Sequence, residues 1–246
     1  MECKIPNGID MTQQASWCPG CGHGIIVRLL AEAAEALGIE DRMLTVEDVA
    51  CGEFAQFALK YNTIMSAHGR PIIAAAGLKR VRPDAIVVAH PGDRSAYSIG
   101  IESTHHCALR NENKLALVVK NSVFGKTGGQ MSPTSIVNMK TTSSPHGRTV
   151  KKDGNPIDIT KILGGLDIAY MARGALDTPA DITKTGKMIK KALQKQMNGE
   201  GFCLVEVLSP CPTNWHMTPV AAMDFIKSKQ SATYPTGEFI DKGGAV

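Results

Sequence analysis

The sequence predicts an α/β protein with a doubly wound, mainly parallel sheet and helices on both faces. Three short apolar runs, at 86–89, 115–119 and 203–208, have the continuous hydrophobicity of strands that are buried on both sides. Segments with helical character alternate with these runs, which is typical of doubly wound folds. We therefore expect a parallel sheet as the centre of the fold.

The first predicted helix covers 23–37. Its apolar residues recur at helical spacing, and Gly38 follows in the position that commonly ends a helix. A crossover helix is predicted over 96–110, a stretch without proline between the first two strands. The last helix, from about Pro179 to Met197, has proline at its start and lysines toward its end, and it leads into the strand at 203–208.

One domain is predicted over 17–228, with an arm on each side. Residues 1–16 are polar and show no periodic pattern, and 229–246 are rich in Ser, Thr, Gly and Pro. We expect an N-terminal arm at 1–16 and a C-terminal arm at 229–246, both outside the core.

Composition narrows the functional classes. The chain has 246 residues, a formal net charge of +4 and only short basic pairs, which gives nucleic-acid binding little support. No apolar run reaches the roughly 18 residues of a membrane span, and no apolar secretory segment begins the chain. Seven cysteines are too dilute and odd in number for a disulfide framework. These observations predict a cytoplasmic protein with reduced thiols and no membrane or nucleic-acid partner.

Two polar residues follow two of the predicted strands. Asp93 and Asn121 each come just after an apolar run, and ligands of such folds gather at the carboxyl ends of the strands. A strand–helix–strand unit brings this carboxylate and this amide oxygen to neighbouring strand ends. Hard oxygen ligands suit magnesium, which completes its shell with phosphate oxygens and water. Capping or turn roles are an equally good interpretation of the spacing alone.

Four cysteines form a second candidate site. Cys18 and Cys21 make a tight C-x-x-C pair, while Cys51 and Cys211 lie in loops flanked by Gly or Pro. The pair alone fits a redox dithiol, half of a zinc site or chance. All four together reach the number that tetrahedral zinc or a four-iron cluster requires, and the residue types leave both open. The remaining cysteines are predicted to be core filler or incidental: Cys3, Cys107 and Cys203.

Two glycine motifs are discounted. Gly125-Lys126-Thr127 resembles the end of an NTPase phosphate loop, but Lys120 stands where that loop needs its first glycine. The run Gly20-x-Gly22-x-Gly24 has a cysteine inside it and no strand ahead of it, so it does not indicate a dinucleotide site.

Five segments together resemble the thiamine-diphosphate-binding, beta-type subunit of 2-oxoacid:ferredoxin oxidoreductases, particularly the 2-oxoglutarate and 2-oxoisovalerate types. The resemblance runs from about Trp17 to Ile226. It is carried by WCPGCGHG at 17–24, HGR at 68–70, GD at 92–93, TGGQMSPT at 127–134 and CPTNW at 211–215.

The resemblance implies a thiamine-diphosphate-binding fold and a domain over 17–228 that holds two cofactors. It implies that one 4Fe–4S cluster is ligated by Cys18, Cys21, Cys51 and Cys211. It also implies that the Mg²⁺ of thiamine diphosphate is held by Asp93, Asn121 and the backbone carbonyl of Val123. Further positions expected to bind the cofactor are Gly92, Arg94, Ser95, Gly125, Thr127 and Gly128. Lys126 and His68 are candidates to meet the substrate carboxylate, and each is nearly as consistent with an ordinary loop residue.

The implied activity is the oxidative decarboxylation of a 2-oxoacid to an acyl-coenzyme A, or the reverse carboxylation. Thiamine diphosphate supplies the reactive carbon, and electrons pass through the cluster to ferredoxin. In this family the glutamate that activates the cofactor comes from a pyrimidine-binding partner subunit. The chain is therefore expected to hold half of an active site, and neither Glu47 nor Glu53 is assigned that role.

One position departs from the family pattern, because Gly-Asp-Gly is replaced by Gly92-Asp93-Arg94. A side chain at 94 can crowd the diphosphate or require an unfavourable positive φ, or its guanidinium can pair with the diphosphate. We expect cofactor binding to survive because Asp93, Asn121 and the loop at 127–130 remain. The alternatives are an iron–sulfur electron-transfer subunit that has lost thiamine chemistry through Arg94, and a zinc-stabilised binding module without redox function.

Overall fold

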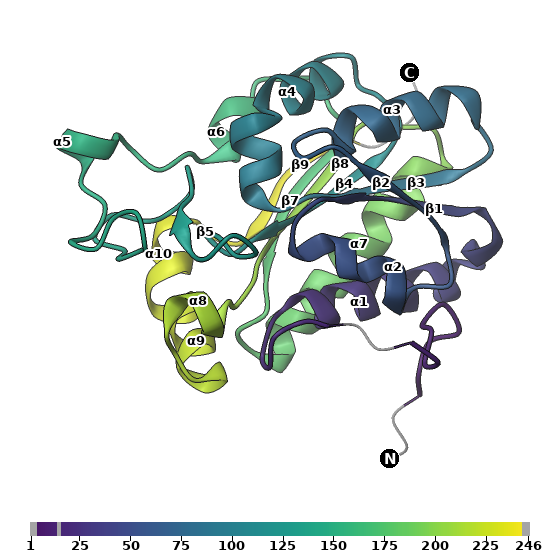
Figure 1. The fold of residues 1–246 in the computed structure, drawn as a ribbon. Helices are drawn as coiled ribbons and strands as arrows, with labels where there is room; N and C mark the ends of the chain where they lie inside the picture. Colours follow the sequence, from purple (N-terminus) through teal and green to yellow (C-terminus); the bar gives the residue numbers. More distant parts are fainter. Residues whose placement is uncertain (1–3, 14–15, 243–246) are drawn as a thin grey trace.

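A seven-stranded sheet forms the centre of the computed structural model, which describes residues 4–13 and 16–242 (Figure 1). The strand order is β2-β1-β3-β4-β8-β7-β9. Neighbouring strands are parallel except for β9, which runs antiparallel to β7. The predicted mainly parallel sheet is confirmed. The strands are β1 Met43–Asp48, β2 Asn62–Ser66, β3 Ile86–His90, β4 Leu115–Lys120, β7 Tyr170–Ala175, β8 Cys203–Leu208 and β9 Gly237–Asp241.

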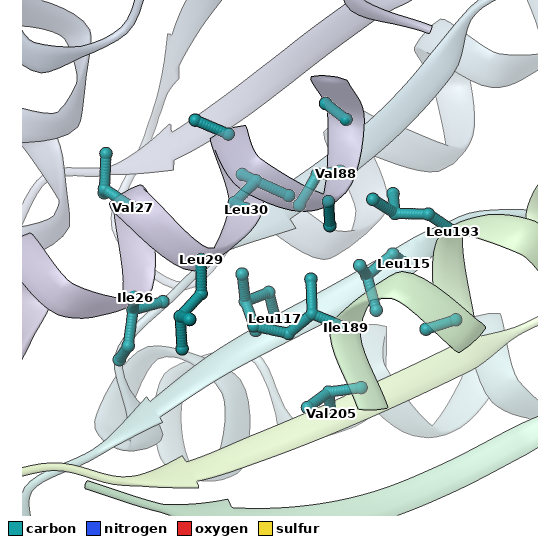
Figure 2. Packing of buried hydrophobic residues seen from close by; sticks show 14 of the residues in the cluster. Ile26, Val27, Leu29, Leu30, Val88, Leu115, Leu117, Ile189, Leu193 and Val205 are labelled. Atoms are coloured by element: carbon teal, nitrogen blue, oxygen red, sulfur yellow. The ribbon is translucent and has the colours of Figure 1, made fainter. Parts of the chain in front are cut away.

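Helices cover both faces of the sheet, as predicted (Figure 1). One face packs against α1 His23–Leu37, α2 Ala55–Ala58 and α7 Pro179–Met197. The opposite face packs against α3 Pro71–Val81, α4 Ile101–Leu109 and α6 Ile159–Leu163. In Figure 2, leucine and isoleucine side chains of α1 and α7 meet Leu115, Leu117 and Val205 of the central strands. This burial of apolar side chains on both faces holds the strand ends in a fixed arrangement.

The predicted crossover helix at 96–110 is interrupted. A π-helical turn at Ser95–Ile99 precedes α4, and Gly100 lies at the junction. A Cβ atom on Gly100 would lie 2.2 Å from the carbonyl oxygen of Gly69. The break therefore occurs where this helix passes directly against another backbone segment.

Two buried strands escaped the sequence prediction because charged side chains interrupt their apolar pattern. β1 ends with Glu47 and Asp48, and β7 contains Arg173, and all three side chains are buried. A search for continuous apolar runs misses strands of this kind.

The expected C-terminal arm at 229–246 does not lie outside the core. Gln230 and Tyr234 are buried, and β9 adds an edge strand to the sheet. Within residues 229–242 the segment forms the end of a π-helical turn at Ile226–Gln230, a short helix at Ser231–Thr233 and the edge strand β9. Part of the expected N-terminal arm also packs on the domain, because Ile9 forms a β-bridge with Leu59.

Short elements complete the described chain. No helix within residues 4–13 and 16–242 is long and apolar enough to cross a bilayer. The short elements are η1 Glu40–Arg42, η2 Cys51–Phe54, β5 Val123–Phe124, β6 Gln130–Met131, α5 Val150–Asp153, α8 Pro212–Trp215, α9 Pro219–Phe225, η4 Ile226–Gln230 and α10 Ser231–Thr233.

Candidate active site

A cavity of about 340 Å³ lies at the carboxyl ends of β1, β3 and β4. The ends of these strands and the loops after them contribute residues 48–52, 92–95, 121 and 123–127 to its wall. This is the place where ligands bind in open parallel sheets. The cavity is lined by both predicted catalytic candidates and by all predicted cofactor-binding positions except Gly128: His68, Gly92, Asp93, Arg94, Ser95, Asn121, Val123, Gly125, Lys126 and Thr127.

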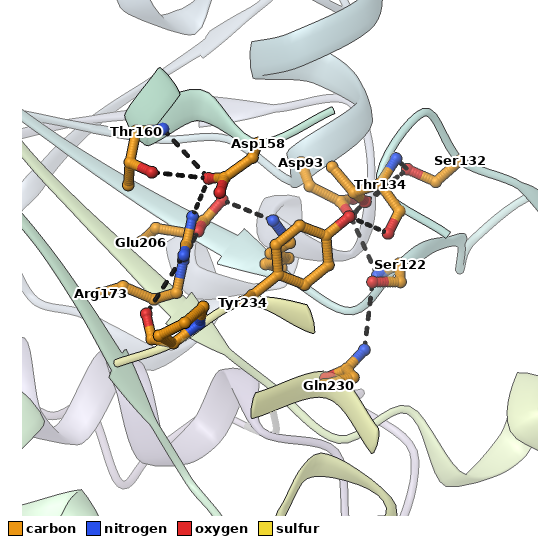
Figure 3. Close-up of polar contacts among 12 residues, drawn as sticks. Asp93, Ser122, Ser132, Thr134, Asp158, Thr160, Arg173, Glu206, Gln230 and Tyr234 are labelled. Atoms are coloured by element: carbon orange, nitrogen blue, oxygen red, sulfur yellow. Dashed lines mark hydrogen bonds and ion pairs between the residues drawn. The ribbon is translucent and has the colours of Figure 1, made fainter. Parts of the chain in front are cut away.

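Asp93 lines this cavity with a buried side chain, and Figure 3 shows the polar groups around it. Its Oδ2 atom accepts hydrogen bonds from the backbone N–H of Ser122 at 2.9 Å, from Ser132 Oγ at 3.3 Å and from Thr134 Oγ1. Within the described part of the chain, its Oδ1 atom accepts one hydrogen bond, from the backbone N–H of Arg94 at 2.9 Å. Burial raises the pKa of Asp93 to about 6 in spite of these donors. A nearby cation would offset that burial, and Oδ1 is the oxygen left with room to bind it.

The turn after β4 brings the other two predicted magnesium ligands next to Asp93. Ser122 has a left-handed backbone, with φ of 59°, and its buried N–H group points to Asp93. Asn121 and Val123 flank Ser122, and the Val123 N–H donates to Asn121 Oδ1 at 3.2 Å. Asp93, Asn121 and the backbone carbonyl of Val123 could therefore hold one divalent cation with oxygen ligands.

Arg94 adopts an ordinary helical conformation, with φ of −64°. The positive φ that this position could have required does not occur. The guanidinium carbon lies 3.4 Å from the centroid of the Phe124 ring, and the Nε atom is buried with no hydrogen-bond partner among the described residues. The side chain thus brings a positive charge to the wall of the cavity.

The two catalytic candidates already have carboxylate partners. Lys126 forms an ion pair with Glu53, and His68 Nδ1 lies 2.9 Å from Asp48 Oδ1. Among the described cationic side chains that line the cavity, Arg94 alone has no carboxylate partner. An anion entering the cavity would find its least neutralised charge at this residue.

A second cavity of about 290 Å³ is lined by all four predicted cluster ligands, Cys18, Cys21, Cys51 and Cys211. No three Cys, His, Asp or Glu side chains within the described ranges converge on a point where they could hold a single metal ion. The four thiols line the same cavity, so the number of ligands that tetrahedral zinc or a four-iron cluster requires is present at one place. Cys107 and Cys203 are buried away from this cavity, as predicted, and Cys3 lies outside the described residues.

Hydrogen-bond donors contact individual thiols of this set and the backbone beside them. Asn214 Nδ2 lies 3.4 Å from Cys211 Sγ, and the Trp17 indole N–H donates to the Cys51 carbonyl at 2.8 Å. Burial raises the pKa of Cys21 to about 12, and the backbone N–H of His23 partly opposes this rise. Burial likewise raises the pKa of Cys51 to about 11. Positive charge from a bound metal group would be needed to keep these sulfurs as thiolates.

The two cavities share a wall made of His23, Cys51, Asn121, Gly125 and Lys126. A Cβ atom on Gly125 would lie 3.1 Å from Cys51 Sγ and 3.4 Å from Asn121 Nδ2. Because Gly125 has no side chain, its backbone can lie close to both Cys51 and Asn121 in this wall. His23 is buried within it, and burial lowers its pKa to about 3, so its ring is neutral.

The family model for the "Thiamine pyrophosphate enzyme, C-terminal TPP binding domain" matches residues 48–207. The chain belongs to the thiamine pyrophosphate enzymes. The matched range contains every residue predicted to bind thiamine diphosphate. Cys18, Cys21 and Cys211 lie outside it, so the family match concerns the first cavity rather than the second.

Curated relatives of this thiamine pyrophosphate enzyme chain are oxidoreductase and synthase subunits. It is 37% identical to the ketoisovalerate oxidoreductase subunit VorA of Methanothermobacter thermautotrophicus, over 92% of this chain and 48% of the relative. It is 32% identical to the 2-oxoglutarate synthase subunit KorB of Archaeoglobus fulgidus, over 86% of this chain and 75% of the relative. The chain thus spans about half the length of the ketoisovalerate relatives that it matches.

A solved structure of a 2-oxoglutarate:ferredoxin oxidoreductase from Magnetococcus marinus, with 2-oxoglutarate, coenzyme A and succinyl-CoA bound, has the same fold. Its TM-score is 0.81 and its sequence identity is 25%, over 99% of this chain and 86% of the solved chain. The likeness covers nearly all of the present chain, including the segments on both sides of the family match.

Sequence reasoning missed several polar partners in this thiamine pyrophosphate enzyme site. Ser132 and Thr134 were noted only as part of a motif, and their hydroxyl groups bind Asp93. Sequence reasoning also does not connect the two catalytic candidates with their carboxylate partners. Asp48, at the end of β1, pairs with His68. Glu53, in the turn that follows β1, pairs with Lys126. The signal that could have found Asp48 is its place at the end of a strand, but that strand was itself not predicted.

Proposed function

We propose that the chain is the thiamine-diphosphate-binding, iron–sulfur subunit of a 2-oxoacid:ferredoxin oxidoreductase. The observation that carries this proposal is the wall shared by the oxygen-lined cavity and the four-cysteine cavity. Two cofactors held on either side of such a wall would be close enough to exchange electrons. The names of the relatives support the same reaction class.

In this proposal Asp93, Asn121 and the carbonyl of Val123 hold Mg²⁺, and the loops at 92–95 and 125–128 hold the cofactor. Thiamine diphosphate, when bound, supplies the reactive carbon for decarboxylation. Cys18, Cys21, Cys51 and Cys211 hold one 4Fe–4S cluster. The Asn214 amide and the His23 backbone N–H donate to the sulfurs of Cys211 and Cys21, and they would thereby help to set the redox potential of a cluster bound there. Thiolate ligands of this kind also fit the reducing cytoplasm predicted from the sequence.

His68 and Lys126 are proposed to orient the substrate. Each lines the first cavity and is held in place by a carboxylate, Asp48 or Glu53. The Nδ1 atom of His68 is engaged by Asp48, which leaves Nε2 as the ring nitrogen available to a substrate oxygen. Fixing these groups before the substrate arrives reduces the entropy lost in reaching the reactive geometry.

A partner subunit is proposed to complete the site. Glu47 is buried and its Oε2 atom lies 2.8 Å from His90 Nδ1, while Glu53 is paired with Lys126. Each of these two glutamates thus already has a partner within the chain, which supports an activating glutamate from a pyrimidine-binding subunit. Ferredoxin would accept the electrons and coenzyme A the acyl group.

The proposal is tested by reconstituting the chain with its partner subunit and measuring reduction of ferredoxin or a viologen dye. A panel of pyruvate, 2-oxoglutarate, 2-oxoisovalerate and aryl 2-oxoacids, each with coenzyme A, identifies the substrate. We expect at least one acid to drive reduction. A complex with an intact cluster that neither binds thiamine diphosphate nor responds to any acid would instead be an electron-transfer subunit.

Arg94 is expected to strengthen binding of the diphosphate. Replacing it with glycine, which restores the usual family residue, should weaken equilibrium binding of thiamine diphosphate by about 10- to 100-fold, because a charge-assisted hydrogen bond contributes about 1.5 to 3 kcal/mol. Arg94→Lys should lose less, since it keeps the charge. Binding of thiamine without phosphate groups serves as the control and should not change. Tighter diphosphate binding by Arg94→Gly would show that the side chain crowds the site.

A further inference from the structure

The loop at 121–134 carries two of the proposed magnesium ligands, Asn121 and Val123. The C-terminal segment, residues 226–236, holds this loop through two buried side chains (Figure 3). Gln230 Nε2 donates to Ser122 Oγ at 3.1 Å. The hydroxyl group of Tyr234 donates to the carbonyl oxygen of Thr134 at 2.7 Å. The segment thus contacts the loop at both of its ends.

Both contacts fall on residues that bind Asp93 directly. Ser122 gives its N–H group to Asp93 and stands between Asn121 and Val123. Thr134 gives its hydroxyl group to the same Asp93 oxygen. Ser122 also has a left-handed backbone, which is unfavourable for a residue with a Cβ atom. Such a conformation persists only where the surrounding contacts hold it in place.

The C-terminal segment is itself anchored to the sheet. Lys120 Nζ lies 3.2 Å from the centroid of the Tyr234 ring, and Arg173 Nη1 donates to the carbonyl oxygen of Pro235 at 3.2 Å. Lys120 and Arg173 both pair with Glu206, and all three of these charged side chains are buried. They come from three neighbouring strands, β4, β7 and β8, so the segment rests on a buried ion-pair network within the sheet.

We propose that Gln230 and Tyr234 are positioning residues for the magnesium site. They hold Ser122 and Thr134 in place. These two residues in turn fix the Asp93 carboxylate, and Ser122 presents its neighbours Asn121 and Val123 to the cation. The inference rests on the proposed function, because it takes Asp93, Asn121 and Val123 as the magnesium ligands. It adds a segment that was expected to be an arm and that lies outside the family match.

The test uses two substitutions that preserve size, Gln230→Met and Tyr234→Phe, in the complex with its partner subunit. The magnesium concentration at half-saturation is measured at fixed thiamine diphosphate by equilibrium binding, together with the thermal midpoint of the cofactor-free protein. Each variant is expected to raise the magnesium midpoint by about tenfold, as loss of a supporting hydrogen bond does at metal sites. The binding defect should disappear at saturating magnesium.

Tyr61→Phe is the matched control. Its hydroxyl group is buried at a distance from the loop, in the cluster that packs on α1, and has no hydrogen-bond partner among the described residues. It should leave the magnesium midpoint unchanged. A merely structural role for Gln230 and Tyr234 would lower the thermal midpoint and leave the magnesium midpoint as in the wild type, which would overturn the inference.

The proposed function and the positioning role would be overturned by different results. Wild-type protein that binds no magnesium–thiamine diphosphate, or Asp93→Asn protein that binds it normally, would overturn the proposed function and this inference with it. Normal binding by Gln230→Met and Tyr234→Phe, beside a defect in Asp93→Asn, would overturn only the positioning role.

Discussion

Asp93→Asn protein is expected to bind magnesium–thiamine diphosphate about 100-fold or more weakly, since even supporting residues of metal sites contribute 10- to 100-fold. The substitution keeps the side-chain shape but removes the charge that would meet the cation. It also introduces an N–H₂ group among donors that now point to Asp93, from Arg94, Ser122, Ser132 and Thr134. Activity with any 2-oxoacid should fall with the loss of cofactor.

The measurement is equilibrium binding of thiamine diphosphate across a magnesium series, with visible absorption recorded on the same samples. The iron–sulfur absorption should be retained, because Asp93 does not line the four-cysteine cavity. Asp84→Asn is the matched control, since that carboxylate is exposed and pairs with Arg82 at the surface. Unchanged cofactor binding in Asp93→Asn would remove the proposed magnesium site.

Cys211→Ser and Cys21→Ser proteins are expected to lose the cluster and its electron transfer. Both thiols line the four-cysteine cavity without lining the other one, so binding of thiamine diphosphate should be affected far less. Iron content and absorption near about 400 nm, which bleaches on reduction of a thiolate-bound cluster, measure the loss. Dye reduction by substrate should fall to background because the electrons have no acceptor in the chain.

Cys107→Ala and Cys203→Ala are the controls for this set, because both cysteines are buried in the cores on the two sides of the sheet. They are expected to keep full iron content, at a modest cost in stability. Colourless wild-type protein with stoichiometric zinc would contradict the prediction and favour the zinc-stabilised module.

Apolar pattern predicted the parts of the fold where burial and hydrophobicity coincide. β3, β4 and β8 and the helices α1 and α7 were found at nearly their observed limits. β1 and β7 were not found, because Glu47, Asp48 and Arg173 are buried charges whose partners come from distant segments. A sequence window cannot show those partners, and so it interprets each charge as a sign of exposure.

The candidate site, like the fold, could be predicted in part from the sequence. Residues that directly follow strands, such as Asp93 and Asn121, were assigned from their position, and the cysteines from their spacing. The contacts of Gln230 and Tyr234 were not predictable, because each joins residues about a hundred positions apart. The composition of their segment predicts an arm, and the buried charges on β4, β7 and β8, the apolar cluster around Tyr234 and the pairing of β9 with β7 explain why it folds back.

The shared wall limits how the chain can change over evolutionary time. A substitution at Gly125 or Cys51 alters the boundary of both cavities, whereas one at Asp93 or Cys211 alters a single cavity. A substitution in the shared wall that removed one binding site would therefore also damage the other. A descendant that keeps only the iron–sulfur function would therefore have to arise through changes outside the wall.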